Sequence, residues 1–423
     1  MQARKIIEFA VIVLLALSTL LLYPVPHQLE MTTLGQSGYE SLAIADSIAH
    51  GHGFANPFRE IVTGPSAHVA PLFPAFLALL IKYSASDAAA AILMTWSATL
   101  VVVLQICLLP FLARFLGLGF YTGVAASVAW LVAGLPREVF WEQNYSGVFI
   151  TLTVFLMVMA LRGPLKMQWL ILCAVLWGVL LLLCPVALLA LAAWFGVVYF
   201  RRVQQAKSLV ILALIPVLMI APWMLRNYSV FHRVVFVRDN LGIEMDVSNN
   251  SCASFSFVVN ELTRCYAYHH PNENLDEIRH VGEVGEVAYN QERMQLAKAW
   301  INENPGAFAT LTLKRFTAFW VPMFLSSELN VTKNPEFYSP LRDDVISMAS
   351  LLGIVGAVLM WRKNRDAFLV VMIWLTTFPV IYYFTQYNER ARIPVDWAIL
   401  LLACYAISEV GKMLMTGRAV SGQ

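Results

Sequence analysis

The stretch from Gly38 to Pro74 reads GYESLAIADSIAHGHGFANPFREIVTGPSAHVAPLFP and follows the first apolar segment of the chain. Glu40, Ala43 and Asp46 fall near helical spacing, and the run from His50 to Gly53 must end that helix. The prolines and the Thr-Gly-Pro sequence that follow predict an ordered turn before apolar sequence resumes. Acid, imidazole and tight turns at the edge of an apolar segment predict a site at the boundary between lipid and water.

The composition fixes the broad class of the protein. Hydrophobic residues make up 59% of the 423 residues and charged residues only 13%, which is too few charges to solubilise a chain of this length. Several apolar runs approach the length that crosses a bilayer. We therefore expect an all-α polytopic membrane protein. The net charge of +2 carries no information because the two signs are segregated along the chain, and nothing indicates a nucleic-acid partner.

The apolar runs predict about ten membrane crossings. They lie at 6–23, 88–112, 118–135, 146–161, 168–183, 186–200, 208–225, 345–361, 367–384 and 396–411. The run from Leu72 to Tyr83 is too short to cross, and excluding it places the basic clusters that follow the other runs on the side of Arg4 and Lys5. We therefore expect 71–84 to be half-buried or re-entrant and both termini to be cytoplasmic.

The crossings divide the chain into three parts. We expect a transmembrane module at 1–226, whose outer loop at 24–87 carries the active site. A small extracytoplasmic cap and an interfacial helix should occupy 227–344, and the last transmembrane helices 345–423. Within the cap, 276–300 has a helical pattern. The run 308–325 should lie in the interface with Phe319 and Trp320 inward, because a crossing would bury Lys314 and Arg315.

Three motifs carry a family resemblance. The first comprises Ala45, Ile48, Gly51, Gly53, Phe54, Pro71 and Pro74; the second is P-W-M-L-R-N at 222–227, and the third R-A-R-I-P at 390–394. In this order the motifs resemble the GT-C class of polyprenyl-phosphate-sugar-dependent membrane glycosyltransferases. The group that it most resembles includes protein mannosyltransferases and bacterial aminoarabinose transferases. That family usually places an acid about one helical turn earlier, where this chain has Ser37 and Gly38; Glu40 lies on roughly the same face.

The resemblance implies an integral membrane enzyme of the inner (plasma) membrane with its active site on the extracytoplasmic side. Such an enzyme transfers a hexose or pentose from a polyprenyl-phosphate donor to a glycan, lipid or protein acceptor, in contact with membrane lipids. The leaving group is already good, so the protein must chiefly deprotonate the acceptor hydroxyl and hold the phosphate. One carboxylate acting as base predicts an inverting displacement. A divalent metal is possible in this family, although no tight ligand spacing is present in the chain.

Glu40 is the preferred general base, and the alternative is an acid that only solvates a surface helix. Asp46 is the rival, as a second catalytic acid or a metal ligand. Glu142, on a short outer loop, can complete the cavity or be an ordinary loop acid.

Arginines at outer helix ends are candidates for the donor phosphate, because a guanidinium can form two parallel bonds to it. We select Arg226, Arg390 and Arg392, with His68 as a weaker candidate. The alternative for each arginine is contact with lipid headgroups.

Two cysteines, Cys252 and Cys265, fall in the predicted cap, where an oxidising compartment favours a disulfide. The alternatives are two free thiols or a metal shared with His269 and His270.

A second class of protein fits the same composition. A polytopic transporter or flippase for lipid-linked or small polar substrates would also have many apolar helices and re-entrant segments. It should show charges within its helices and a half-to-half repeat, whereas the charges here lie at helix ends and in loops.

Overall fold

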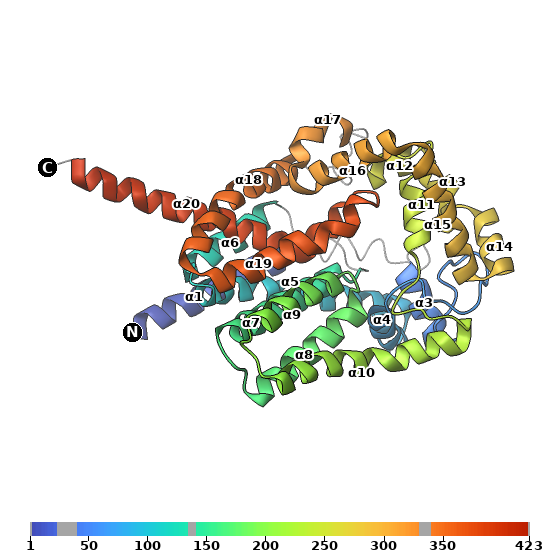
Figure 1. Cartoon of the computed structure of the whole chain (residues 1–423), viewed down its shortest axis with the longest axis horizontal. Helices are drawn as coiled ribbons and strands as arrows, with labels where there is room; N and C mark the ends of the chain where they lie inside the picture. The colour runs from blue at the N-terminus through green and yellow to red at the C-terminus, as the bar shows by residue number, and fades with distance from the viewer. Residues whose placement is uncertain (1, 23–39, 134–140, 330–339, 422–423) are drawn as a thin grey trace.

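The computed structural model describes residues 2–22, 40–133, 141–329 and 340–421, and these residues are almost entirely helical (Figure 1). The apolar helices are α1 (Gln2–Leu22), α4 (Leu72–Lys82), α5 (Asp87–Phe115), α6 (Phe120–Ala133), α7 (Gln143–Arg162), α8 (Met167–Leu183), α9 (Ala187–Phe200), α10 (Ala206–Phe231), α18 (Pro340–Lys363), α19 (Arg365–Thr377) and α20 (Ile393–Ser421). The remaining α-helices are α3 (Glu40–Ala49), α11 (Leu241–Ser248), α12 (Phe257–Leu262), α13 (Cys265–His269), α14 (Leu275–Val284), α15 (Glu286–Glu303), α16 (Pro305–Trp320) and α17 (Ser326–Leu329).

Each of the ten predicted crossings coincides with one apolar helix. Within the described residues, seven helical segments are long and apolar enough to cross a membrane, and α6, α8 and α9 are shorter. The multi-pass membrane class is confirmed, and the count of ten stays a prediction. The additional helix α4 has 11 residues and is about 16 Å long, roughly half of the hydrocarbon core of a bilayer.

Basic residues gather at the end of the bundle where the chain begins. Arg114 at the end of α5 is 2.5 Å from Glu8 on α1, and Arg162 at the end of α7 donates to the carbonyl of Phe115. At the same set of helix ends, Arg201 pairs with Asp366. Figure 1 shows the N-terminus and these helix ends on one side and α11, α14 and α15 on the other. The grouping follows the charge placement expected from the positive-inside rule.

This grouping gives a topology prediction. A reporter fused after Ser84 should indicate the outside, and one fused after Arg114 should indicate the cytoplasm, because α5 alone lies between them. Alkaline phosphatase and green fluorescent protein fusions measure the two locations. The opposite pattern would show that α4 and its flanks cross the membrane.

The polar segment 232–304 folds at the far end of the bundle. Ile243 and Val247 of α11 pack with Tyr289 of α15 and with Phe58 from the first loop. The single helix predicted over 276–300 is wrong, because the chain forms α14 and α15 and breaks at Gly285, which has a φ of +84°. Glycine adopts this left-handed conformation at little steric cost.

Helix α16 buries one of its two central charges within the protein and leaves the other partly exposed, and its position in the interface stays a prediction. Phe319 is fully buried, and Lys314 pairs with Glu328. Arg315 is also fully buried, but its guanidinium donates to the carbonyls of Ser248 and Phe384. Neutral carbonyls thus compensate most of the buried charge and join α16 to the end of α11 and to the segment that follows α19.

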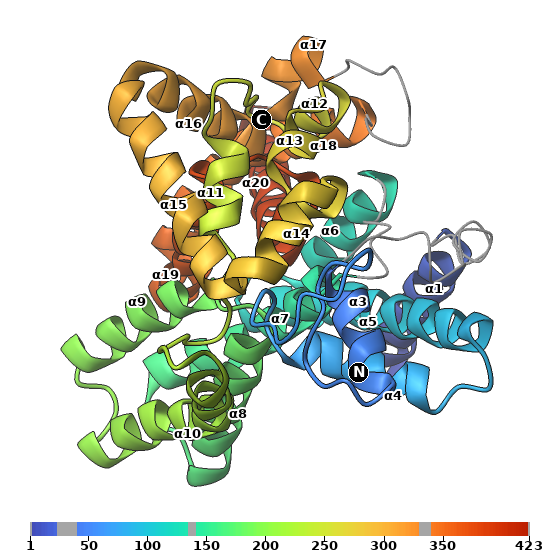
Figure 2. The same cartoon turned by 90° about the vertical axis from the view of Figure 1, so that its right-hand side faces the viewer.

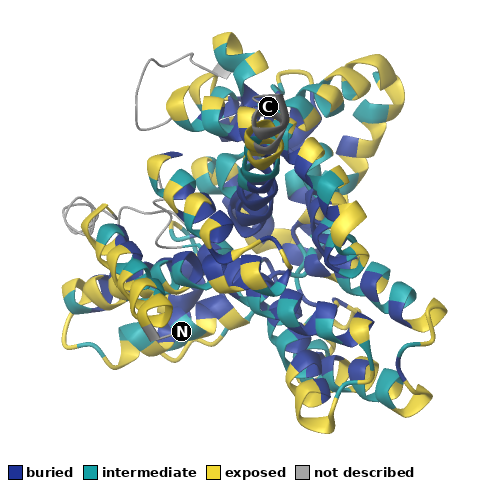
Figure 3. Ribbon diagram, turned by 90° about the vertical axis from the view of Figure 1, so that its left-hand side faces the viewer, coloured by how far each residue is buried: buried dark blue, intermediate teal, exposed yellow. Residues whose placement is uncertain are grey.

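The membrane core is dense at its centre. Trp177 of α8 stacks against Trp194 of α9 and Trp374 of α19, with ring centroids 6.0 and 5.4 Å apart. The first turns of α20 are almost completely buried, and Figure 3 shows them in the middle of the bundle. This core fixes the helices whose far ends carry the candidate site.

Candidate active site

Helix α3 presents Glu40 at its first turn. The helix forms because apolar residues bury one side, including Leu42 and Ile44, which are at most 1% exposed. It ends where Gly51 and Gly53 take φ values of +85° and +77°, as the glycine pattern predicted. An acid in the first helical turn is favoured by the helix dipole. Glu40 is nevertheless only 7% exposed, so its carboxylate faces the protein interior.

Arg226 shapes the loop between α3 and α4. Its two terminal nitrogens donate to the carbonyls of Ser66 and Phe54, at 2.6 and 2.7 Å. The neighbouring motif residue Trp223 packs edge-on against the Phe54 ring and donates to the carbonyl of Val237. The P-W-M-L-R-N motif therefore ties the end of α10 to the first loop and to the chain that follows.

The same loop directs His68 toward Glu40. The backbone N–H of His68 donates to Ser66 Oγ, and the Nε2 atom of His68 is 3.8 Å from Glu40 Oε1. Next to it, the N–H of Ala67 donates to Glu286 Oε1 at 2.6 Å, and the carbonyl of Ala67 accepts from the N–H of Asp239. Contacts on both sides thus hold His68 against the carboxylate.

Burial raises the pKa of Glu286 to about 8. The carboxyl of the unfolded chain ionises near pH 4.5, so between this pH and about pH 8 the folded state binds one more proton than the unfolded state. The stability of the fold therefore decreases as the pH rises through this range. We expect about 2 kcal/mol of stability to disappear between about pH 6 and about pH 8. Glu286→Gln keeps the bond to Ala67 and should remove this loss. Thermal unfolding at the two pH values measures the loss of stability. Glu283→Gln, which changes an exposed acid, is the control. An unchanged pH dependence in Glu286→Gln would contradict the assignment of the raised pKa to Glu286.

His270 reaches Glu40 from the polar segment. It follows α13 directly, and its Nε2 atom is also 3.8 Å from Glu40 Oε1. Asn272, two residues later, donates its side-chain N–H to Glu40 Oε1 at 2.7 Å and its backbone N–H to Nδ1 of His270. One short turn therefore orients both the imidazole and the carboxylate.

A disulfide closes the segment just before this turn. Cys252 and Cys265 are bonded, and Cys265 is the first residue of α13. Because both sulfurs are bonded to each other, they are not available to a metal shared with His269. Instead His269 contacts Asp246 at 3.2 Å.

Both imidazoles beside Glu40 are neutral at ordinary pH. Burial lowers the pKa of His68 to about 3, a shift that the charge of Glu40 opposes. Burial also lowers the pKa of His270 to about 3, and the nearby Arg390 guanidinium adds to the effect. The two imidazoles that flank Glu40 are thus neutral, and the Asn272 amide donates to its carboxylate.

Glu40, His68 and His270 bring three metal-ligating atoms within 4.8 Å of one another. Nδ1 of His270 accepts from the Asn272 N–H, so the proton of the neutral ring lies on Nε2, the atom that faces Glu40. Nδ1 of His68 has no hydrogen-bond partner among the described residues. Metal-binding histidines almost always donate their second nitrogen to an acceptor. The donor set therefore does not fit a divalent metal, and we assign no step to one.

Arg238 and Arg390 lie at this cluster without an acidic partner in the described chain. Nε of Arg238 donates to Asn240, and the Arg390 guanidinium lies 3.5 Å from the centre of the Trp141 ring. Both arginines act on Glu244 of α11, whose pKa is raised by burial and partly lowered by them. Glu142 is the neighbour of Trp141 in the sequence and the residue before α7.

The structure separates the sequence candidates into two groups. It brings His68 within 3.8 Å of Glu40 and places Arg390 close enough to act on His270, whereas the role of Glu142 stays a prediction. Asp46 projects elsewhere, is well exposed and lies 3.3 Å from His50. Arg226 is occupied by loop carbonyls, as described above.

Arg392 is also absent from the cluster. It is 2% exposed, and its Nε donates to Asp396 Oδ1 at 3.1 Å. The residue thus serves as a buried ion pair at the start of α20, and we no longer assign it to a phosphate.

Sequence reasoning missed four residues of the site: Asn272, Glu244, Arg238 and, in this role, His270. His270 was considered only with the cysteines. The sequence H-P-N at 270–272 was the available signal. Polar residues around a proline at a helix end are typical of a turn in which a side chain bonds the nearby backbone.

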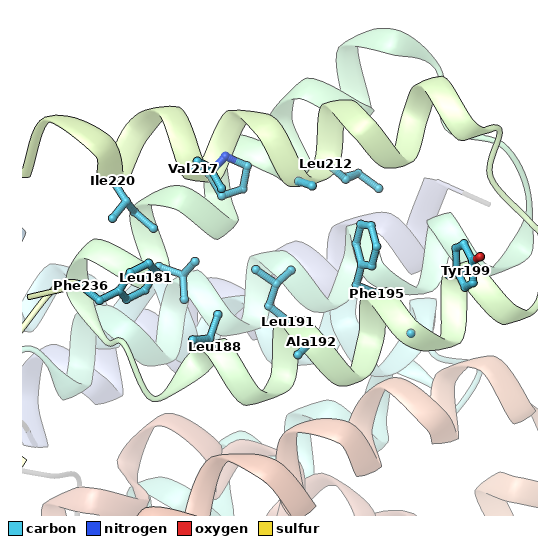
Figure 4. A pocket seen from close by; sticks show the side chains of 13 residues that line it. Leu181, Leu188, Leu191, Ala192, Phe195, Tyr199, Leu212, Val217, Ile220 and Phe236 are labelled. Atoms are coloured by element: carbon cyan, nitrogen blue, oxygen red, sulfur yellow. The ribbon is translucent and has the colours of Figure 1, made fainter. Parts of the chain in front are cut away.

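An apolar groove runs along α8, α9 and α10 (Figure 4). Its volume is about 570 Å³, and Leu191 and Phe195 of α9 face Val217 of α10 across it. Its outer end is lined by Phe236, two residues before Arg238. The groove therefore ends at the segment that carries Arg238.

Comparison with known proteins gives one informative likeness. Neither a protein-family model nor a curated protein matches the chain. The crystal structure of the apo oligosaccharyltransferase of Archaeoglobus fulgidus is similar, with a TM-score of 0.55 and 15% identity over 98% of this chain and 52% of that chain. The chain thus spans about half the length of that protein. The described part of the chain shares the fold of that structure, and the GT-C class stays a prediction. The narrower mannosyltransferase and aminoarabinose transferase group stays a prediction.

Proposed function

We propose that the protein is a membrane glycosyltransferase that transfers one sugar from a polyprenyl-phosphate donor to an extracytoplasmic acceptor hydroxyl. The observation that carries the proposal is the buried carboxylate of Glu40, oriented by Asn272 and flanked by two neutral imidazoles, in a chain whose fold resembles that of the A. fulgidus structure. The A. fulgidus neighbour is itself an oligosaccharyltransferase. Its likeness supports the reaction class here, and the donor and acceptor are our proposal.

Glu40 is the general base in this proposal. Asn272 holds Oε1, which fixes the direction in which the carboxylate accepts a proton. The acceptor hydroxyl gives its proton to Glu40 as its oxygen bonds to the anomeric carbon and the bond to the phosphate oxygen breaks. The electron pair leaves with the polyprenyl phosphate. This single displacement inverts the anomeric centre and requires no covalent sugar–enzyme intermediate.

Arg238 and Arg390 bind the donor phosphate. Among the described arginines discussed above, Arg226 and Arg392 are occupied by carbonyls or by an acid, whereas these two have no ion-pair partner. The guanidinium of Arg390 lies over the Trp141 ring. Its N–H groups point outward in the plane of the guanidinium, where they can form two bonds with a phosphate.

The groove of α8, α9 and α10 holds the isoprenoid chain of the donor. Its lining is apolar along most of its length, and it includes Phe236, which is two residues from Arg238 in the sequence. An amphipathic lipid with a phosphate at one end and a branched hydrocarbon at the other matches this polarity. A flippase would place its polar cavity at mid-membrane, whereas this cluster lies at the helix ends.

A transfer assay tests the proposal. The purified protein is incubated with a panel of undecaprenyl-phosphate sugars and a cell-envelope extract, and released undecaprenyl phosphate is measured. Release from at least one donor, absent in the Glu40→Gln variant, is the expected result. If the protein binds these lipids but releases no undecaprenyl phosphate from any of them, the enzyme assignment is wrong.

A further inference from the structure

A second polar cavity lies one to two turns along α3 from Glu40. Its volume is about 410 Å³, within the range of roughly 300–1,000 Å³ that is typical of small-molecule sites. It is lined by Leu42, Ala43, Asp46, Ser47, His52, Asn56, Phe58, Arg59, Ile61, Val62, Ile81 and Asp87. The lining comes from α3, the first loop, the end of α4 and the start of α5.

Ser47 is the first indication of a ligand. Its side chain is 5% exposed and its hydroxyl has no hydrogen-bond partner among the described residues. An unpaired buried hydroxyl costs free energy, and a helix interior could have satisfied it through a carbonyl one turn back. A hydroxyl of a bound molecule would complete its hydrogen bonding.

Phe58 is the second indication. Its ring lines the cavity and also packs edge-on against His68 and His270, at centroid distances of 5.4 and 6.3 Å. One aromatic ring thus separates the cavity from the imidazoles beside Glu40. Along α3, Ser47 is seven residues from Glu40, a rise of about 10 Å. A molecule in the cavity therefore lies beside the proposed reaction centre.

The charges of the lining select the kind of molecule. Asp46 and Asp87 are carboxylates, and Arg59 is one guanidinium. Carboxylates accept hydrogen bonds from hydroxyl and ammonium groups and repel phosphates and uronic acids. Figure 2 shows α3 and α4 on the opposite side of the view from α9 and α10, so the cavity is away from the donor groove.

We propose that this cavity is an acceptor subsite that binds a neutral or amino-bearing sugar unit, next to the sugar that receives the transfer. The assignment of the sugar to the acceptor rests on the proposed function. Asp46 and Asp87 accept from its hydroxyl or ammonium groups, Ser47 completes the contacts inside, and Phe58 supplies an apolar wall for a ring face. Asp46 is then a binding residue rather than the second catalytic acid that the sequence indicated.

Ligand-observed NMR of the purified protein tests the subsite. The probes are methyl mannoside, N-acetylglucosamine, glucosamine and, as the anionic counterpart, glucuronate. At least one neutral or amino sugar should bind, and glucuronate should bind more weakly. The double variant Asp46→Asn/Asp87→Asn should lose about tenfold or more in affinity, because hydrogen bonds to charged groups are replaced by neutral ones.

Two controls make the result specific. Glu60→Gln removes an exposed acid of the same loop that does not line the cavity, and it should leave affinity unchanged. Glu40→Gln should also retain sugar binding while it abolishes transfer. Asp46 and Asp87 are exposed, so the double variant is expected to fold, and its thermal midpoint checks this.

Three results would overturn the subsite: no binding by any neutral or amino sugar, unchanged binding in the double variant, or equal binding of glucuronate. The test of the subsite and the test of the proposed function can give different results. Sugar binding that depends on Asp46 and Asp87, with no transfer from any donor, would support the subsite and contradict the enzyme assignment.

Discussion

We expect Glu40→Gln to lower the rate of sugar transfer by about a hundredfold to ten-thousandfold, the range of general-base catalysis. Glutamine keeps the size of the side chain and an oxygen that can accept from Asn272, but it cannot take the acceptor proton. Binding of the donor lipid should be nearly unchanged, because Arg238 and Arg390 hold the phosphate. Single-turnover kinetics with a bound donor separate the two quantities.

Two further acids serve as comparisons for this result. Glu244→Gln changes a carboxylate of the same cluster. We expect it to lower the rate of transfer less than Glu40→Gln does, because Asn272 orients Glu40 and not Glu244. Asp46→Asn should affect acceptor affinity more than the rate with saturating acceptor. If Glu40→Gln turns over normally and either of the others is inactive, the base is misassigned although the enzyme class survives.

The second large effect that we expect is that of Arg390→Ala on the binding of the donor. We expect the donor Kd to rise about tenfold or more, because a charge-assisted bond to the phosphate is lost in a partly buried site. Arg238→Ala should act in the same direction. Arg390→Lys should recover only part of the affinity, since an ammonium keeps the charge but not the planar pair of donors.

Arg279→Ala is the matched control for donor binding. This arginine is exposed on α14 and pairs with Asp276, away from Glu40, and its loss should leave Kd unchanged. Fluorescence titration with undecaprenyl phosphate measures all four variants. Equal losses in Arg279→Ala would indicate nonspecific attraction to the lipid, and an unchanged Kd in both Arg390→Ala and Arg238→Ala would place the phosphate elsewhere.

The loop held by Arg226 explains why its motif is informative without being catalytic. The arginine donates to two carbonyls that come from residues about 160 and 172 positions earlier in the chain. Such a contact positions His68 and fixes the wall of the site. A sequence motif can thus indicate residues that support the loop of a site, as well as residues that carry out its chemistry.

By itself, the sequence determined the membrane class, the apolar helices, the helix that begins at Glu40 and the GT-C resemblance. These follow from local properties: the length of apolar runs, the spacing of polar residues and the glycines at 51 and 53 that end α3. Glu40, His68, Arg390 and Glu142 were selected because they are polar residues next to apolar runs. The fold places His68 beside Glu40 and Arg390 near His270, and the role of Glu142 stays a prediction.

Only the tertiary structure decided which polar residues share the site. Arg226, Arg390 and Arg392 all lie at helix ends, yet carbonyls occupy the first and Asp396 neutralises the last. His270 and Asn272 approach Glu40 from more than 200 positions away in the sequence. Partners so distant leave no local pattern, because side-chain pairing depends on how the helices pack and not on the spacing of residues along the chain.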